Sequence, residues 1–253
     1  MIAWLLKPRA LKPAPPARQS LPATVEIAGR AVPLVVREHH AARRLIMRVS
    51  PTGDVRLTVP PRTSRKLILA FLERHSAWAD ARLAARPAAQ AITDGAILPL
   101  RGLSTRIAHE PARRVHAIDS EGDGQVLRIG GDPAHLGRRV RDALKKEALA
   151  DLRPAVARHA AAAGVTPAGL QIRDTRSRWG SCSSTRRLSF SFRIVMAPPG
   201  ILDYLAAHEV AHLREMNHGP GFWALCRDLC PQTEAARDWL RTNGASLHAI
   251  EFG

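Results

Sequence analysis

The sequence predicts an α+β fold in which an antiparallel, β-rich N-terminal region precedes a domain that combines helices with a sheet. Three observations carry this prediction. Short apolar or alternating segments separated by turn residues run from Thr24 to Ile129, which is typical of antiparallel strands. A long helical pattern follows from Asp132 to about Ala163. The rest of the chain alternates short strand patterns with helical ones, as in an α+β domain.

These patterns divide the chain into three parts. Residues 1–22 carry Lys7, Arg9, Lys12 and Arg18, several prolines and no acidic residue, which predicts a flexible basic arm. Residues 23–130 form the β-rich region with one helix. Residues 131–253 form the helix-and-sheet domain, which contains the chemistry-bearing motifs.

The β-rich region is expected to hold eight short strands and one helix. A turn at Pro51–Asp54 predicts a hairpin over Leu45–Val59, and Gly122-Asp123-Gly124 predicts another hairpin turn. The helix is capped by Thr63 or Ser64 and ends before Pro87. Its predicted apolar face consists of Leu67, Ile68, Phe71, Leu72, Trp78 and Leu83. The strands are Val25–Ile27, Val32–Val36, Leu45–Val49, Val55–Val59, Ile97–Leu100, Thr105–Ala108, Val115–Ile118 and Val126–Ile129.

The second domain begins with a long helix. Asp132 is its predicted N-cap, Pro133 occupies its first turn and Gly164 ends it. A short strand at Leu170–Ile172 is followed by a strand at Leu188–Met196, whose alternation predicts one buried face and one wet face with Ser189, Ser191 and Arg193. Two closing helices are expected around Phe222–Leu229 and Trp239-Leu240.

The helix expected after Pro198-Pro199-Gly200 contains His208-Glu209-Val210-Ala211-His212, an H-E-x-x-H pattern. Residues four apart lie on one face of a helix, so His208 and His212 can share one metal ion. Glu209 lies beside that face, where its carboxylate can act on water without being a ligand. A surface helix with scattered histidines is the plain alternative.

A third ligand is needed for a tetrahedral site with an open position. His218 comes six residues after His212, and a helix that ends near Glu215 or Met216 would let the chain bring it back to the ion. Asn217 tolerates a left-handed conformation, and Gly219-Pro220-Gly221 prevents helix continuation. Histidine ligands favour zinc, although copper, nickel and cobalt also bind such sites.

The sequence resembles the YgjP-like metallopeptidase domain family, which is related to the SprT-like zincins. The similarity rests on Ser177–Cys182, His208–His218 and Phe222-Trp223; it is dense from about Leu170 to Leu240 and looser from Thr24 to Gly169. It implies a zincin-like, minigluzincin-like fold with three histidine ligands to zinc. On this chain the ligands would be His208, His212 and His218, and Glu209 the catalytic residue.

The chemistry expected at such a site needs groups around the metal. Zinc lowers the pKa of water to about 7, and Glu209 would take the proton and pass it to the leaving group. Arg178, and after it Arg176, could stabilise an oxyanion or bind substrate through a guanidinium fork. Tyr204 precedes His208 by one turn. It either donates a hydrogen bond to the site or has only a structural role in packing. Trp179 either lines the cleft or belongs to the core.

Three functions remain open. The first is a zinc peptidase, which needs a free sheet edge that an extended peptide can pair with. The second is a metal-dependent hydrolase of nucleotide or other phosphoanhydrides, favoured by the density of arginine between Ile172 and Arg193. The third is a basic nucleic-acid-binding protein with a structural metal. A net charge of +16 would attract any anionic partner. The alternative is that the charge reflects only a genome-wide preference for arginine.

Cysteine usage and hydropathy bear on location. Three cysteines do not make a disulfide framework, and Cys182, Cys226 and Cys230 are expected to be thiols in a reducing compartment and not metal ligands. No apolar run approaches the ~18 residues of a membrane helix, and the apolar start is too short for a signal peptide. We therefore expect a cytoplasmic protein without a membrane partner.

Overall fold

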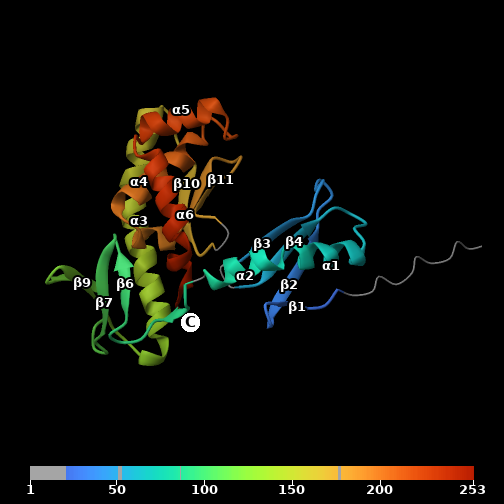
Figure 1. The fold of residues 1–253 in the computed structure, drawn as a ribbon. Helices are drawn as coiled ribbons and strands as arrows, with labels where there is room; N and C mark the ends of the chain where they lie inside the picture. The colour runs from blue at the N-terminus through green and yellow to red at the C-terminus, as the bar shows by residue number, and fades with distance from the viewer. Residues whose placement is uncertain (1–20, 51–52, 86, 176–177) are drawn as a thin grey trace, which may run out of the picture. The chain divides into compact units, whose positions relative to one another are not determined.

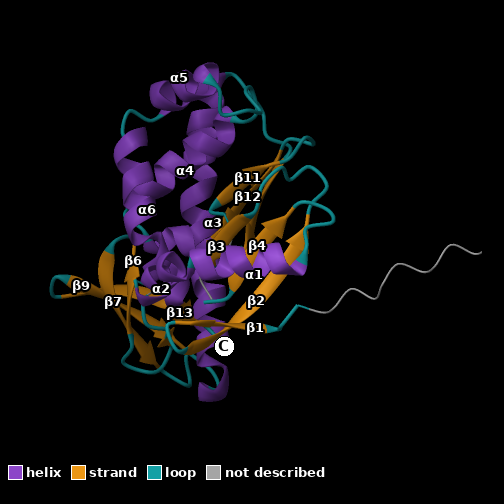
Figure 2. Cartoon of the chain, turned by 45° about the vertical axis from the view of Figure 1, so that its right-hand side comes forward, coloured by secondary structure: helices purple, strands orange, loops and turns teal. Residues whose placement is uncertain are grey.

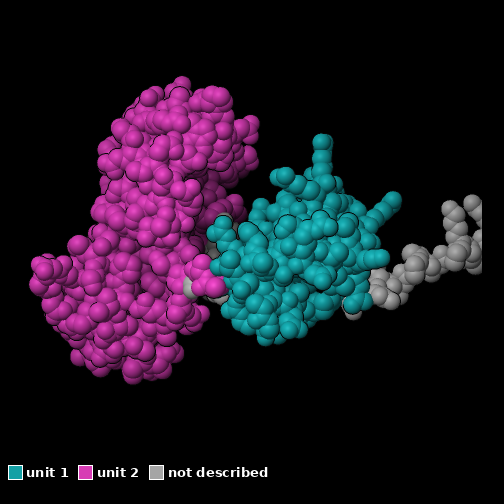
Figure 3. Space-filling view, in the orientation of Figure 1, with its two compact units in different colours: residues 1–49, 53–83 teal, residues 50–52, 84–253 magenta. Residues whose placement is uncertain are grey.

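The computed structural model describes residues 21–50, 53–85, 87–175 and 178–253. The chain divides into two compact units, residues 1–49 with 53–83 and residues 50–52 with 84–253 (Figure 3). Both units combine strands with helices (Figure 2), so the mixed α+β class is confirmed. Residues 1–20 of the predicted basic arm lie outside the described residues.

The first unit is a four-stranded sheet with two helices. Its strand order is β1-β2-β4-β3, with the outer pairs antiparallel and the central β2–β4 pair parallel. The predicted hairpin between β3 and β4 is present, although part of its turn is not described. Valine, leucine and isoleucine side chains from β1, β2 and β4 pack against α1. The elements are β1 (Thr24–Ile27), β2 (Arg30–Glu38), β3 (Ile46–Val49), β4 (Val55–Val59), α1 (Arg65–Arg74) and α2 (Ser76–Ala84).

One helix was predicted after β4, and the structure has two. Ser64 caps α1 by accepting a hydrogen bond from Leu67 N at 3.2 Å, as expected, but α1 ends at His75 and α2 begins directly after it. The predicted apolar face is therefore only partly buried. Leu67 and Trp78 are 52% and 42% exposed, whereas Ile68, Leu72 and Ala79 are buried.

The second unit contains a sheet with the same arrangement. Its strand order is β6-β7-β9-β8, again with a parallel central pair, β7–β9, between antiparallel hairpins. The predicted antiparallel pairing is present in the outer pairs of both sheets, but the central pair of each sheet is parallel. Strand β8 starts two residues later than predicted, and Val115 is exposed. The strands are β6 (Ile97–Leu100), β7 (Leu103–His109), β8 (Ala117–Glu121) and β9 (Gly124–Ile129). The short strand β5 (Gln90–Ala91) precedes this sheet and pairs in parallel with residues 250–251.

This second sheet packs with the helices that follow it in the chain. Its inward residues, including Leu98, Leu100 and Ile107, share one hydrophobic core with α3 and α4. The sequence grouped residues 23–130 together, whereas the structure places the division between its compact units at Leu83 and Ala84. Strand patterns alone carry no information about which helix covers each sheet, and burial against α3 decides it.

Helix α3 (Leu136–Ala163) runs the length of the second unit (Figure 1). One part packs beside the β6–β9 sheet and another beside α4. Gly164 ends α3 in the left-handed conformation, at φ 63°, as the sequence predicted. Asp132 accepts a hydrogen bond from Ala134 N at 2.8 Å, so it caps a 3-10 turn, η1 (Pro133–His135), that leads into the helix.

A three-stranded sheet and three more helices complete the second unit. The sheet order is β10-β12-β11, with β10–β12 parallel and β11–β12 antiparallel. No described helix is long and apolar enough to cross a membrane. The elements are β10 (Gly169–Arg173), β11 (Gly180–Cys182), β12 (Arg187–Ser191), η2 (Phe192–Met196), α4 (Pro199–Ala211), α5 (Pro220–Leu229), α6 (Thr233–Ala249) and β13 (Ile250–Glu251).

The strand predicted over Leu188–Met196 ends early, at Ser191. Residues 192–196 form the 3-10 helix η2, and all five are buried. Ser191 and Arg193, predicted to face water, are 0% and 2% exposed. A 3-10 turn carries three residues per turn, so the period-two alternation stops predicting which side chains are wet.

Arg193 can be buried because its guanidinium donates hydrogen bonds to protein acceptors, which take the place of water. Nη1 donates to Leu247 O at 2.8 Å and to Ile250 O at 2.9 Å, and Nε donates to Asp174 at 3.1 Å. The guanidinium also lies near the rings of Phe192 and Phe252. These contacts bind η2 to the end of α6 and satisfy carbonyl groups that the helix cannot pair internally.

Replacing Arg193 should therefore destabilise the second unit strongly. Arg193→Ala leaves buried carbonyl groups without donors, and we expect the free energy of unfolding to fall by about 3–5 kcal/mol. Urea unfolding followed by tryptophan fluorescence measures the change. Arg153→Ala on the exposed side of α3 is the matched control and should stay within about 0.5 kcal/mol of the parent. Equal effects for the two variants would contradict this role for Arg193.

Candidate metal centre

Helix α4 presents two of the three expected histidines. His208 lies in its last turn, and His212 is the C-cap residue. The helix begins with Pro199 in its first turn, where a missing N–H costs nothing. It is buried around most of its circumference by residues such as Leu202, Leu205 and Val210, so the two imidazoles are held on a rigid element.

The chain turns sharply after His212 and brings His218 back. Leu213 N donates to Val210 O and Arg214 N to Ala211 O, so the last turn tightens to 3-10 spacing. The helix therefore ends earlier than the predicted stop near Glu215 or Met216. Asn217 is not among the described residues with positive φ; the reversal uses a bond from Gly219 N to Asn217 O at 2.7 Å.

The three imidazoles converge. One ring nitrogen from each of His208, His212 and His218 lies within 4.8 Å of the others, and the Nε2 atoms of His208 and His218 are 3.1 Å apart. Two nitrogen ligands of a tetrahedral zinc ion lie about 3.3 Å apart, given Zn–N bonds of about 2.0–2.1 Å. The spacing and the donor set thus fit a metal ion. No other such group of three occurs among the described residues.

Two hydrogen bonds fix the orientation of the His208 and His212 rings. His212 Nδ1 lies 3.0 Å from Glu215 O, so Nδ1 carries the proton and Nε2 keeps its lone pair for a metal. His208 Nδ1 lies 3.2 Å from the Tyr204 hydroxyl. Tyr204, considered from the sequence as a donor to the site, therefore contacts the back of a ligand ring. Such outer partners orient ligands and tune metal affinity.

Burial favours the neutral form of two of the imidazoles, His208 and His212. It lowers the pKa of His208 to about 3, with smaller contributions from the neighbouring imidazoles and Arg237, and it also lowers the pKa of His212. Neutral imidazole is the form that binds metal. The ring of Phe222, from α5, packs against all three histidines with centroid distances of 4.9, 4.4 and 4.6 Å, which excludes water from that side.

Glu209 is 3% exposed and lies next to the ligands on α4. Its Oε2 atom has no hydrogen-bond partner among the described residues, although a buried carboxylate oxygen normally has one. Burial raises the pKa of Glu209 to about 8, and the charge of Arg178 partly opposes that shift. A carboxylate with an unpaired oxygen beside the three clustered histidines is available to accept a proton.

Strand β11 passes so close to Glu209 that only glycine fits. A Cβ on Gly180 would lie 2.3 Å from Glu209 Oε1 and 2.7 Å from its carboxyl carbon. β11 is an edge of its three-stranded sheet. Sequence reasoning did not single out Gly180, although an isolated glycine in a strand is a known sign of close backbone approach.

A hollow of about 430 Å³ begins at Gly180 and extends over the sheet that contains β11. Arg178 is exposed and lines it, so the structure brings this predicted residue near Glu209. Arg176 lies outside the described residues. Trp179 packs against Gly244 and His248 of α6 and joins the core. Other polar residues that line the hollow are Gln171, Arg173, Ser181, Ser183, Thr185, Arg187 and Ser189.

The cysteines lie apart from the imidazole cluster. Cys226 and Cys230 are buried with Tyr204 and Phe222 in a small core, and Cys182 is half-buried on β11. All three are free thiols, and burial raises the pKa of each. Burial makes a thiol a weaker nucleophile and metal ligand.

Comparisons with known proteins found a matching family model and a similar solved structure. A model of the family described as YgjP-like, metallopeptidase domain, matches residues 43–243. The crystal structure of the metallopeptidase zymogen of Pyrococcus abyssi abylysin matches with 16% sequence identity and a TM-score of 0.34, covering 36% of this chain and 92% of that chain. No curated protein matches.

Loss of one histidine should abolish tight metal binding. We expect His218→Ala to weaken zinc binding by more than the ~10–100-fold that loss of an outer partner costs, because two imidazoles remain. Metal analysis after dialysis against a weak chelator measures retention. His135→Ala, which removes an exposed histidine from the start of α3, should keep zinc at the parental level. Full zinc content in His218→Ala would remove His218 from the ligand set.

A methyl group at position 180 should push β11 away from α4. Gly180→Ala is expected to lower the free energy of unfolding by about 1–3 kcal/mol through overpacking against Glu209. Gly169→Ala, in the same sheet, meets no atom closer than 4.0 Å and is the control. Denaturant unfolding of both variants gives the comparison. Equal stability would show that β11 and Glu209 are not tightly packed.

Proposed function

This chain belongs to the YgjP-like metallopeptidase domain family, and from that premise we propose that it is a zinc-dependent peptidase. In this proposal His208, His212 and His218 hold the ion, and Glu209 is the general base. Membership of this family leads us to expect a metal-dependent hydrolase that acts on a peptide or protein substrate. The finer assignments rest on the geometry of residues 178–223.

The observation that carries the proposal is the position of β11. This edge strand contacts α4 at Gly180, directly beside Glu209, and α4 holds two of the clustered histidines. An extended peptide can add to a free sheet edge through backbone hydrogen bonds. A peptide paired with β11 would pass Glu209, so substrate binding and chemistry would share one place.

Each residue then has a definite task. The three imidazoles hold the ion, which when bound supplies Lewis acidity that polarises the carbonyl under attack and acidifies water. Glu209, whose Oε2 has no hydrogen-bond partner in the described part of the chain, accepts the proton of the attacking water and delivers it to the leaving amine. Phe222 excludes solvent, and Tyr204 orients His208.

Arg178 is the proposed oxyanion-stabilising residue. It is exposed at the rim of the hollow, and its charge acts on Glu209. A guanidinium is charged at every relevant pH, so it can stabilise negative charge that develops during attack. The same charge favours the ionised form of Glu209, which is the form that accepts a proton.

A phosphoanhydride hydrolase is the second candidate, and one observation favours it. Arg173, Arg178 and Arg187 all line the hollow that begins at Gly180. Guanidinium groups that face one space suit the oxygens of di- and triphosphates. Two other arginines of this segment are engaged elsewhere: Arg186 donates to Thr166 O and Arg193 is buried.

Glu209→Gln should separate metal binding from turnover. The amide is nearly isosteric but cannot accept the proton, so we expect parental zinc content and turnover lower by at least about 10²-fold. Activity is measured on a peptide library and on a nucleotide panel, with product analysis. Glu215→Gln is the matched control, because it changes an exposed side chain while keeping the carbonyl that binds His212.

The outcomes distinguish the alternatives. Cleaved peptides that disappear with Glu209→Gln support the peptidase, and released phosphate or pyrophosphate that disappears with it supports the second candidate. Parental turnover in Glu209→Gln would mean that Glu209 is not the base. Zinc loss in that variant would make Glu209 a ligand or a structural residue.

A further inference from the structure

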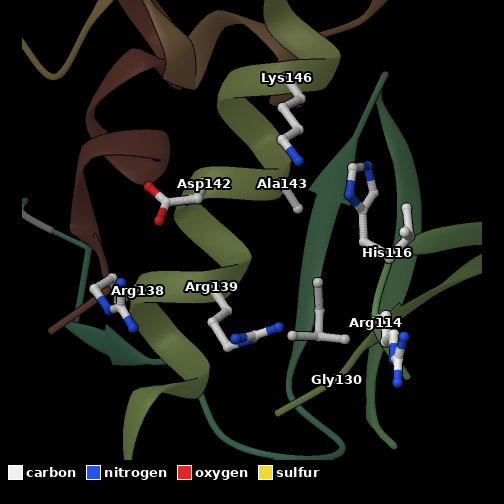
Figure 4. A pocket seen from close by; sticks show the side chains of 10 residues that line it. Arg114, His116, Gly130, Arg138, Arg139, Asp142, Ala143 and Lys146 are labelled. Carbon is white, nitrogen blue, oxygen red and sulfur yellow. The ribbon is translucent and has the colours of Figure 1, made fainter. Parts of the chain in front are cut away.

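A second hollow lies in the same unit, lined by residues that the metal centre does not use. It has a volume of about 220 Å³ and lies between the first half of α3, the segment before β8 and the turn after β9. Figure 4 shows Arg139 and Lys146 reaching from α3 toward the strands, and Arg114 and His116 on the opposite side. The remaining lining residues are Val115, Ile129, Gly130, Arg138, Asp142 and Ala143.

The cations of this hollow are not neutralised by the protein. No ion pair joins Arg114, Arg139 or Lys146 to an acidic side chain among the described residues. Asp142, the acid that lines the hollow, lies 3.7 Å from Lys145 and 4.0 Å from Arg141. Nearby Glu147 is held by Arg101 at 2.8 Å and by His116 at 2.9 Å. Converging like charges repel each other unless an anion joins them.

The position of two arginines on α3 adds to the excess of positive charge. Arg138 and Arg139 lie in the first turn of this helix, which contains no acidic residue. The macrodipole makes the N-terminus of a helix positive, so it favours anions there and disfavours cations. Two arginines at the N-terminus of this 28-residue helix interact unfavourably with its dipole. An anion bound between them would interact favourably with both the dipole and the arginines.

Glycines bring the two sides of the hollow together. A Cβ on Gly130 would lie 1.7 Å from Arg113 O, directly before Arg114. A Cβ on Gly131, where φ is +92°, would lie 2.6 Å from the guanidinium carbon of Arg139. The Gly130-Gly131 turn therefore lets the backbone beside Arg114 and the Arg139 side chain approach each other, so the site is preformed.

We propose that this hollow binds a phosphate-bearing ligand and that Arg139, Arg114 and Lys146 hold its phosphoryl oxygens. A phosphoryl group offers up to two charges and three acceptor oxygens, which matches several cations that line one hollow better than a carboxylate does. The volume is smaller than the ~300–1,000 Å³ of sites for drug-sized ligands. Arg114, Arg138 and Lys146 are exposed, so the rest of a larger ligand can extend into solvent.

Calorimetric titration of the zinc-loaded full chain with sodium pyrophosphate, at physiological ionic strength, tests the proposal. Arg139→Gln and Lys146→Gln should each weaken binding by about tenfold or more, because each removes a charge-assisted hydrogen bond. Arg153→Gln, an exposed arginine farther along α3, should change the dissociation constant by less than about twofold. Zinc content is measured in every variant, since pyrophosphate can also bind at the metal centre.

Two further titrants identify the source of the phosphate. If a short single-stranded oligonucleotide binds, and pyrophosphate does not, with the same loss in Arg139→Gln, the ligand is a nucleic-acid backbone phosphate. If pyrophosphate shows that pattern, the ligand is a free phosphorylated molecule. If Arg139→Gln and Lys146→Gln bound pyrophosphate and the oligonucleotide as tightly as the parent does, the proposal would be overturned. Saturable binding of an acidic peptide alone, or no binding by the parent, would also overturn it.

Discussion

The second unit depends on one constraint: helix α4 is buried, yet it carries a carboxylate, a phenol and imidazole groups. Burying polar groups without partners is costly, so the surroundings must satisfy them or leave them for a ligand. Tyr204 meets His208 and Glu215 O meets His212. Glu209 Oε2 has no partner among the described residues. That exception, beside three converged histidines, marks the place where the fold keeps a polar group available for chemistry.

Small residues make this arrangement possible. Ala206, Ala207 and Ala211 let α4 pack closely in the interior, and Gly180 lets an edge strand come against Glu209. Close approach has two consequences here: it buries the Glu209 side chain, and it puts a sheet edge beside the candidate metal ligands. Core packing and the proposed binding of substrate thus rest on the same contacts.

Arginine has several different physical roles in this chain, which a net charge of +16 conceals. Arg193 is a buried donor to carbonyl groups, Arg101 forms ion pairs with Glu147 and Asp151 on α3, and Arg178 lies at the rim of the hollow beside Glu209. Arg139 lines a second hollow and forms no ion pair with an acidic side chain in the described part of the chain. The number of arginines does not distinguish these roles; burial and the distance to acceptors do.

The sequence by itself determined the features that depend on local spacing. The i, i+4 pair of His208 and His212, the return of His218, the cap at Ser64 and the stop at Gly164 follow from helix geometry and turn chemistry. Tertiary structure decided what local patterns do not encode. It split the two sheets between units, turned Phe192–Met196 into a 3-10 helix, buried Arg193, and set Gly180 and Phe222 around the site. Those outcomes depend on which distant segments pack together, because burial and acceptor geometry arise only from contacts between elements far apart in the chain.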